Sequence, residues 1–135
     1  MSSLPIFDVA GSAMSAQSLR LSTVASNLAN ADSVAGSPDA VYRAKQPVFS
    51  AEAVGANPAL SGVRVTEVKE STAAAIKRYE PGHPLADAQG YVYAPDVDPV
   101  AQMVDMISAS RSYQANVEVF NTAKELANAT LMMGK

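Results

Sequence analysis

The chain has 135 residues, enough for one domain, and its 10 basic and 13 acidic side chains give a net charge of −3. It contains no cysteine, which excludes a disulfide framework, a thiolate nucleophile and a sulfur-ligated zinc site. The acidic balance predicts no nucleic-acid partner, and no stretch reaches the roughly 18 consecutive apolar residues of a membrane span.

Charge is scarce at the N-terminus, where residues 1–30 contain only Asp8 and Arg20. A helix on a protein surface normally carries a charged outer face. Because Arg20 is the first basic residue, the positive start of a cleaved secretory signal is also missing. We therefore expect neighbours to cover this segment, and we expect no cleaved signal peptide.

Residues 1–31 predict a long helix, because apolar side chains recur at alternating steps of three and four. This heptad spacing is typical of a coiled-coil seam. The remaining faces carry small uncharged serine and asparagine side chains, which can pack against further helices without burying charge. The seam consists of Phe7, Ala10, Met14, Gln17, Leu21, Val24, Leu28 and Ala31.

Residues 32–97 show strand and turn patterns in place of helical periodicity, and they predict a small β-containing or irregular insert. Short strands are expected at 47–49 and 63–68, the second with β-branched alternation. An extended segment at 90–95 ends at a proline, and proline-containing turns are expected at 37–39 and 80–84.

Residues 98–135 predict a second long helix. Asp98 is a suitable N-cap, Pro99 suits the first helical position, and no breaker follows before Gly134. The predicted fold is therefore mainly α, with two long terminal helices forming a coiled-coil hairpin around the insert. An alternative is a two-helix hairpin that closes on its own core. The second seam contains Met103, Met106, Ser110, Tyr113, Val117, Phe120, Lys124, Ala127 and Leu131, in which Ser110 and Lys124 are flaws.

The sequence predicts no catalytic, cofactor or metal site. His83 is the only histidine, and with Asp87 it leaves a metal site two ligands short. No nucleophile-elbow pattern supports a serine hydrolase built on that histidine. Carboxylates at Glu67, Glu70 and Glu80 leave a cell-wall hydrolase open as a rival interpretation, although nothing in the spacing pairs them.

Seven segments of the chain resemble the bacterial flagellar rod and hook protein family. They lie in the family's order and cover both helices and the second half of the insert. A longer spacer at 33–41 and the short chain are similar to the proximal-rod members. The segments are 7–21, ASNLANAD at 25–32, YRAKQPVF at 42–49, PGHPLADAQGYV at 81–92, 95–98, 103–117 and NTAK at 121–124.

The resemblance implies a non-enzymatic subunit of the flagellar basal-body rod, the shaft that crosses the periplasm and transmits torque. Expected partners are copies of itself, other rod proteins, the inner-membrane ring with its rod-adapter protein, and the flagellar type III export apparatus. Another rod or hook paralogue and a generic secreted helical hairpin remain alternatives. Residues expected in the family's turn motif are Asn27, Asn30, Asp32, Tyr42 and Arg43. Residues expected to pack within or between subunits are Phe7, Met14, Leu21, Val24, Leu28, Met103, Ile107, Tyr113, Val117, Phe120 and Leu131.

Overall fold

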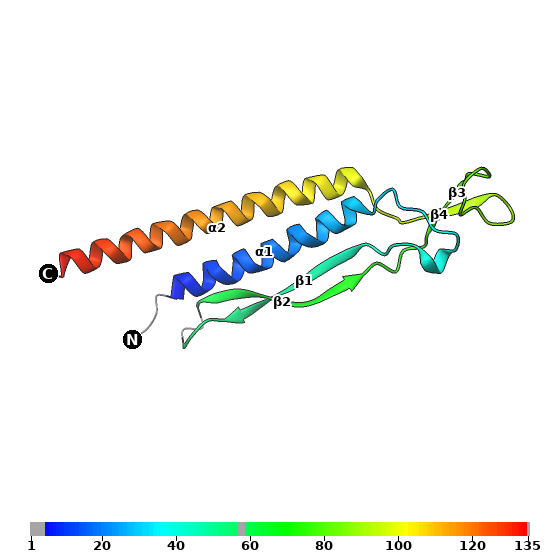
Figure 1. Cartoon of the computed structure of the whole chain (residues 1–135). Coiled ribbons are helices and arrows are strands. Elements are labelled where there is room, and N and C mark those ends of the chain that lie inside the picture. The colour runs from blue at the N-terminus through cyan, green and yellow to red at the C-terminus, as the bar shows by residue number, and fades with distance from the viewer. Residues whose placement is uncertain (1–4, 57–58, 135) are drawn as a thin grey trace.

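The computed structural model describes residues 5–56 and 59–134. Residues 1–4 and 135 of the two expected helices lie outside this part of the chain. Two helices lie side by side, a β-hairpin runs along one of them, and a second small sheet lies at one end (Figure 1). The elements in order are α1 (Pro5–Ala29), a 3₁₀ turn (Pro38–Ala40), β1 (Lys45–Ala53), β2 (Ser61–Glu70), β3 (Ile76–Tyr79), β4 (Tyr91–Ala94) and α2 (Pro99–Met133).

Local signals explain both ends of α2. The Asp98 side chain accepts a hydrogen bond from the Val100 backbone N–H at 2.9 Å, and Pro99 takes the first helical position, as the sequence predicts. The helix continues for 35 residues until Gly134, whose N–H donates to the Thr130 carbonyl.

The strands form two antiparallel two-stranded sheets. In the hairpin, β1 and β2 pair from Lys45 opposite Glu70 to Ala53 opposite Ser61, with a register shift between Val48 and Phe49. Both strands are longer than the sequence patterns predict. In the second sheet β3 pairs with β4, which coincides with the extended segment expected at 90–95.

The predicted coiled-coil hairpin with a small insert is wrong. α1 lies between α2 and the β1–β2 hairpin, so the insert supplies a third layer along the helix (Figure 1). The pattern failed because residues 50–53 have little intrinsic strand preference, and pairing with β2 satisfies their backbone groups instead. The hairpin also accounts for part of the missing charge on α1, because it covers a face that the prediction left to other subunits.

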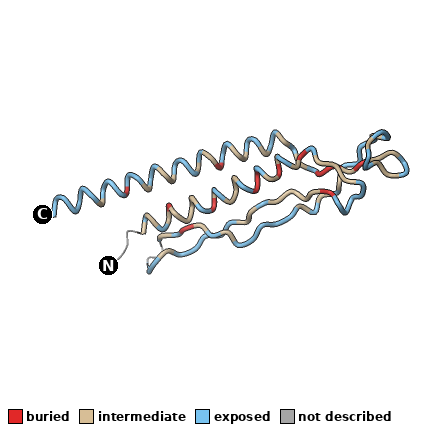
Figure 2. The backbone as a smooth tube through the Cα atoms, in the orientation of Figure 1, coloured by how far each residue is buried: buried red, intermediate tan, exposed pale blue. Residues whose placement is uncertain are grey.

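Small side chains dominate the buried interior. Its residues lie at separate positions along α1, on the facing side of α2 and around β4 (Figure 2). Alanine lets backbones approach closely but buries little apolar area per residue. The apolar core consists of Ala10, Ala16, Val24, Ala31, Val41, Val92, Ala94, Ala109 and Ala123.

Candidate functional site

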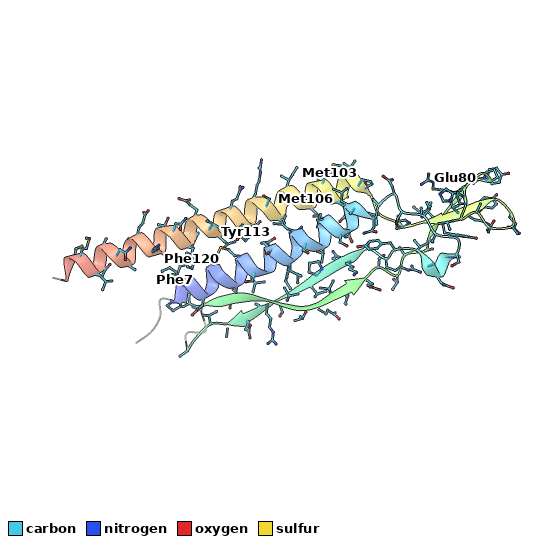
Figure 3. The ribbon with its side chains drawn as sticks, viewed as in Figure 1. Phe7, Glu80, Met103, Met106, Tyr113 and Phe120 are labelled. Carbon is cyan, nitrogen blue, oxygen red and sulfur yellow. The ribbon has the colours of Figure 1, made fainter. Side chains whose placement is uncertain are left out.

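Three contacts define how the helices pair. The rings of Phe7 and Phe120 meet edge to face, with centroids 4.9 Å apart (Figure 3). Nearer the middle, Arg20 Nη2 lies 2.9 Å from Asp105 Oδ1. At the other end Asn27 Nδ2 donates to Gln102 Oε1 at 3.0 Å. The helices are therefore antiparallel, and the last turns of α2 extend past Pro5, the first described residue of α1 (Figure 1).

The buried face of α2 differs from the predicted seam. Ala109, with no exposed area, and Ala123 are its buried residues, whereas the predicted Ser110 is half-buried and Lys124 is exposed. Ala109 and Ala123 are 14 residues apart, which is two heptads, and each directly precedes a predicted seam residue. At Ser110 and Lys124 the predicted register is therefore shifted by one residue from the buried face.

The residues predicted to pack within or between subunits separate into two groups in the single chain. Those in the first group are buried or half-buried, whereas the others are exposed, and Tyr113 also lines a groove with Met14 and Leu19 of α1. The first group comprises Phe7, Met14, Leu21, Val24, Leu28, Val117 and Phe120, and the second comprises Met103, Ile107, Tyr113 and Leu131.

An exposed apolar row lies on the first two turns of α2. Val100, Met103, Val104 and Ile107 follow the spacing i, i+3, i+4 and i+7, and each is 50–67% exposed. The sequence interpretation found Met103 and Ile107 but missed the two valines, which lie outside the heptad seam. Their helical spacing was the available signal. We call these four residues the α2 stripe.

Asn27 is the most connected side chain of the turn motif. It is 3% exposed, and its Nδ2 donates to the Lys45 carbonyl at 2.8 Å and to Gln102. Its Oδ1 accepts from the Tyr42 hydroxyl at 3.0 Å and from the Lys45 N–H at 2.8 Å. One amide therefore joins α1, the start of β1 and α2.

The other motif residues support the same turn to different degrees. Asn30 Nδ2 donates to the Ser26 carbonyl at 2.8 Å, and the Arg43 guanidinium donates to the Ala73 carbonyl. Asp32 is exposed in the turn that follows α1. The family resemblance placed Asn27, Asn30 and Asp32 in one turn motif, but it did not identify Lys45 or Gln102 as partners.

A cleft separates the two helices from the base of the hairpin. Its lining mixes apolar side chains, such as Val24 and Phe49, with charged ones, such as Arg20 and Lys69. Because Arg20 is already paired with Asp105, one of the cleft's charges is neutralised within the chain.

The β3–β4 end holds His83, Asp87 and Glu80 of the residues considered for catalysis, whereas Glu67 and Glu70 lie on β2. His83 Nδ1 accepts from the Leu85 N–H at 3.1 Å. Asp87 Oδ1 accepts from the Tyr91 and Gln89 N–H groups, and Oδ2 accepts from the Tyr93 hydroxyl. These bonds, the Tyr91 N–H foremost, lower the pKa of the Asp87 carboxyl below its ordinary value. Asp87 therefore stabilises this turn through its hydrogen bonds to two backbone N–H groups and to the Tyr93 hydroxyl.

The described residues contain neither a group of metal ligands nor a membrane-spanning helix. Between 5 and 56 and between 59 and 134, no three His, Cys, Asp or Glu side chains are grouped so that they can hold a metal ion. Within the same ranges, neither helix combines the length and apolarity needed to cross a bilayer.

Comparison with known proteins gives consistent relatives. Residues 7–36 match the family model described as flagella basal body rod protein, and residues 88–133 match the C-terminal model of flagellar basal body rod FlgEFG proteins. The flagellar basal-body rod protein FlgC of Escherichia coli O157:H7 is 57% identical, and that of Salmonella typhimurium is 56% identical, each over the full length of both chains. The FlgC of Aquifex aeolicus is 42% identical over 91% of this chain and 90% of its own.

Proposed function

The chain belongs to the FlgC family of flagellar basal-body rod proteins, and we propose on this premise that it polymerises through α1 and α2 into the proximal rod. Membership makes it a structural subunit of the rod in the flagellar basal body, where it assembles with copies of itself and with other rod proteins. In the proposed role it transmits torque along the shaft and catalyses no reaction.

The α2 stripe is the observation that supports polymerisation best. Four apolar side chains at helical spacing, each at least half exposed, leave a face that water solvates poorly. Such a row is suited to pack against another helix, with Met103 adapting to neighbours of different shape. Because each side chain is half to two-thirds exposed, burial of the rest of one such side chain contributes about 1–2 kcal/mol.

The far end of α2 supports the same role. Leu131, Met132 and Met133 are all strongly exposed where α2 extends past the first described turn of α1. Because they are strongly exposed in the described part of the chain, these side chains are available for apolar contacts with other parts of the assembly. We propose that they, with Tyr113 and the stripe, pack between subunits, whereas Phe7 and Phe120 hold the helix pair together within one subunit.

We further propose that the chain reaches the rod through the flagellar type III export apparatus without a cleaved signal peptide. In this proposal its other partners are the inner-membrane ring and the ring's rod-adapter protein. The family resemblance supports the export route and these partners. Crosslinks from exposed positions of the chain to the ring and to neighbouring rod proteins test the partners and separate this assignment from another paralogue.

Complementation of a deletion strain tests the proposed function. Removal of the coding sequence should abolish swimming, and the wild-type gene should restore it. Ile107→Glu should fail to restore swimming although circular dichroism of the purified protein is unchanged, because Ile107 is exposed in the single chain. Gln114→Glu, also exposed on α2, is the matched control and should restore it.

Deletion cells that swim normally overturn the rod assignment. Normal swimming with Ile107→Glu overturns the role of the stripe alone. A stable soluble dimer that forms no crosslinks to rod proteins would instead support the generic helical hairpin.

A further inference from the structure

Hydrogen bonds between described residues attach the β1–β2 hairpin to α1 at two separate points. At the base, the Lys45 N–H donates to Asn27 Oδ1 at 2.8 Å, and Asn27 Nδ2 donates back to the Lys45 carbonyl at 2.8 Å. Near the tip, the Val63 N–H donates to Ser12 Oγ at 3.0 Å. Ser12 and Asn27 lie about 22 Å apart along the helix, at 1.5 Å per residue.

The two attachments are unequal in strength. The base is tied by the buried Asn27, which also holds Tyr42 and Gln102, so four hydrogen bonds converge there. At the tip, a single neutral hydrogen bond joins Val63 to Ser12, whose own hydroxyl donates to the Val9 carbonyl. The tip attachment therefore opens at a lower free energy than the base.

Little apolar burial holds the hairpin down between these points. Of the residues in β1 and β2, all of which the structure describes, only Gly62 is buried, and Phe49 is exposed. The cleft lies beside the base, where β1 residues Pro47 and Phe49 face Val24 across it. Segments with few buried apolar contacts open locally without global unfolding.

Close approach at the tip depends on glycine. A Cβ at Gly62 would lie 2.7 Å from Ser12 Oγ and 3.1 Å from a Val54 methyl group. A larger residue there therefore displaces either Ser12 Oγ or the strand, and either shift weakens the Val63–Ser12 hydrogen bond. The contact is specific to Gly62 and does not involve the base.

We propose that the hairpin is a strap hinged at Asn27, whose far end reversibly detaches from α1 at Ser12 while the hairpin itself stays folded. Detachment uncovers the α1 surface around Ser12 and leaves the junction of α1, β1 and α2 intact. The motion is a property of the single chain and is measured without the rod.

Amide hydrogen exchange of the full-length protein tests this motion at three positions. Lys45 reports the hinge, Val63 reports the tip attachment, and Val54, whose N–H donates to the Leu60 carbonyl, reports the hairpin itself. After correction for intrinsic rates, Val63 should exchange at least about tenfold faster than Lys45 and faster than Val54. Equal protection at Val63 and Lys45 overturns the hinge. Equal exchange at Val63 and Val54 overturns the folded strap, because the hairpin then melts.

Gly62→Ala shifts the same equilibrium without touching the hinge. Its methyl group should remove most of the remaining protection at Val63 and leave that at Lys45 within about twofold of wild type. Gly11→Ala is the matched control, because a Cβ there meets nothing within 4 Å, and it should change none of the three amides. Loss of protection at Lys45 together with Val63 in Gly62→Ala would show that the hairpin moves as one rigid layer and would refute the proposal.

Discussion

Replacement of Asn27 by alanine should destabilise the chain more than replacement of Asn30, the asparagine that directly follows α1. The substitution removes two bonds to Lys45, one from Tyr42 and one to Gln102. With a net contribution of about 1 kcal/mol per hydrogen bond, the ceiling is about 4 kcal/mol. Asn27, Lys45 and Gln102 also line the cleft, so water can replace some lost partners. We therefore expect a loss of about 3 kcal/mol.

Urea unfolding followed by circular dichroism at 222 nm measures this loss. For a dependence of about 2 kcal/mol per molar urea, the midpoint should fall by about 1.5 M. Asn30→Ala is the matched control, because that half-buried side chain donates only one described bond, to the Ser26 carbonyl. It should cost about 1 kcal/mol.

Equal destabilisation by Asn27→Ala and Asn30→Ala, within about 0.5 kcal/mol, would show that the four hydrogen bonds of Asn27 do not set the strength of this junction. Gln102→Ala removes one of the four bonds and gives an intermediate test. It should cost about 1 kcal/mol of stability. A loss as large as that of Asn27→Ala would show that the α1–α2 contact, and not the full set of Asn27 hydrogen bonds, stabilises the junction.

Three further predictions concern the sheets. Gly90→Ala should cost about 1–3 kcal/mol in urea unfolding, because Gly90 has φ +83° and a Cβ would crowd its neighbours, whereas Gly82→Ala, with open space, should be neutral. Because folding lowers the pKa of Asp87, the stability it contributes is present above its ordinary pKa and is lost as pH falls through the lower folded value. Asp87→Asn should remove this part of the pH dependence of the urea midpoint, and an unchanged dependence would contradict the role of Asp87 in the turn. The double substitution Ser12→Cys and Gly62→Cys should form a disulfide, because the two Cβ positions lie 3.5 Å apart. The disulfide should raise the free energy of unfolding by up to about 4 kcal/mol. If mass measurement under non-reducing conditions shows that the two cysteines stay reduced in mild oxidant, the tip geometry is contradicted.

The candidate site was only partly accessible to sequence reasoning. Phe7 and Phe120 were both placed on facing seams, and the structure brings their rings into contact. Tyr42 and Asn27 were both assigned to one turn motif through the family resemblance, and they share a hydrogen bond. Lys45 and Gln102, which complete that junction, were missed, because long-range partners that use a backbone group or an uncharged amide leave no local pattern.

By itself the sequence determined the features that depend on near neighbours. Asp98 and Pro99 start α2 because an N-cap and a proline at the first position act within one turn, and the scarcity of charge in residues 1–30 shows that α1 is covered. Only the tertiary structure decided what covers it. The register of β1 on β2, the helix packing that buries Ala109 in place of Ser110, and the docking of the hairpin through Ser12 and Asn27 all join residues distant in the chain. Such contacts are selected by the packing of the whole fold, because each is too weak locally to leave a pattern in the sequence.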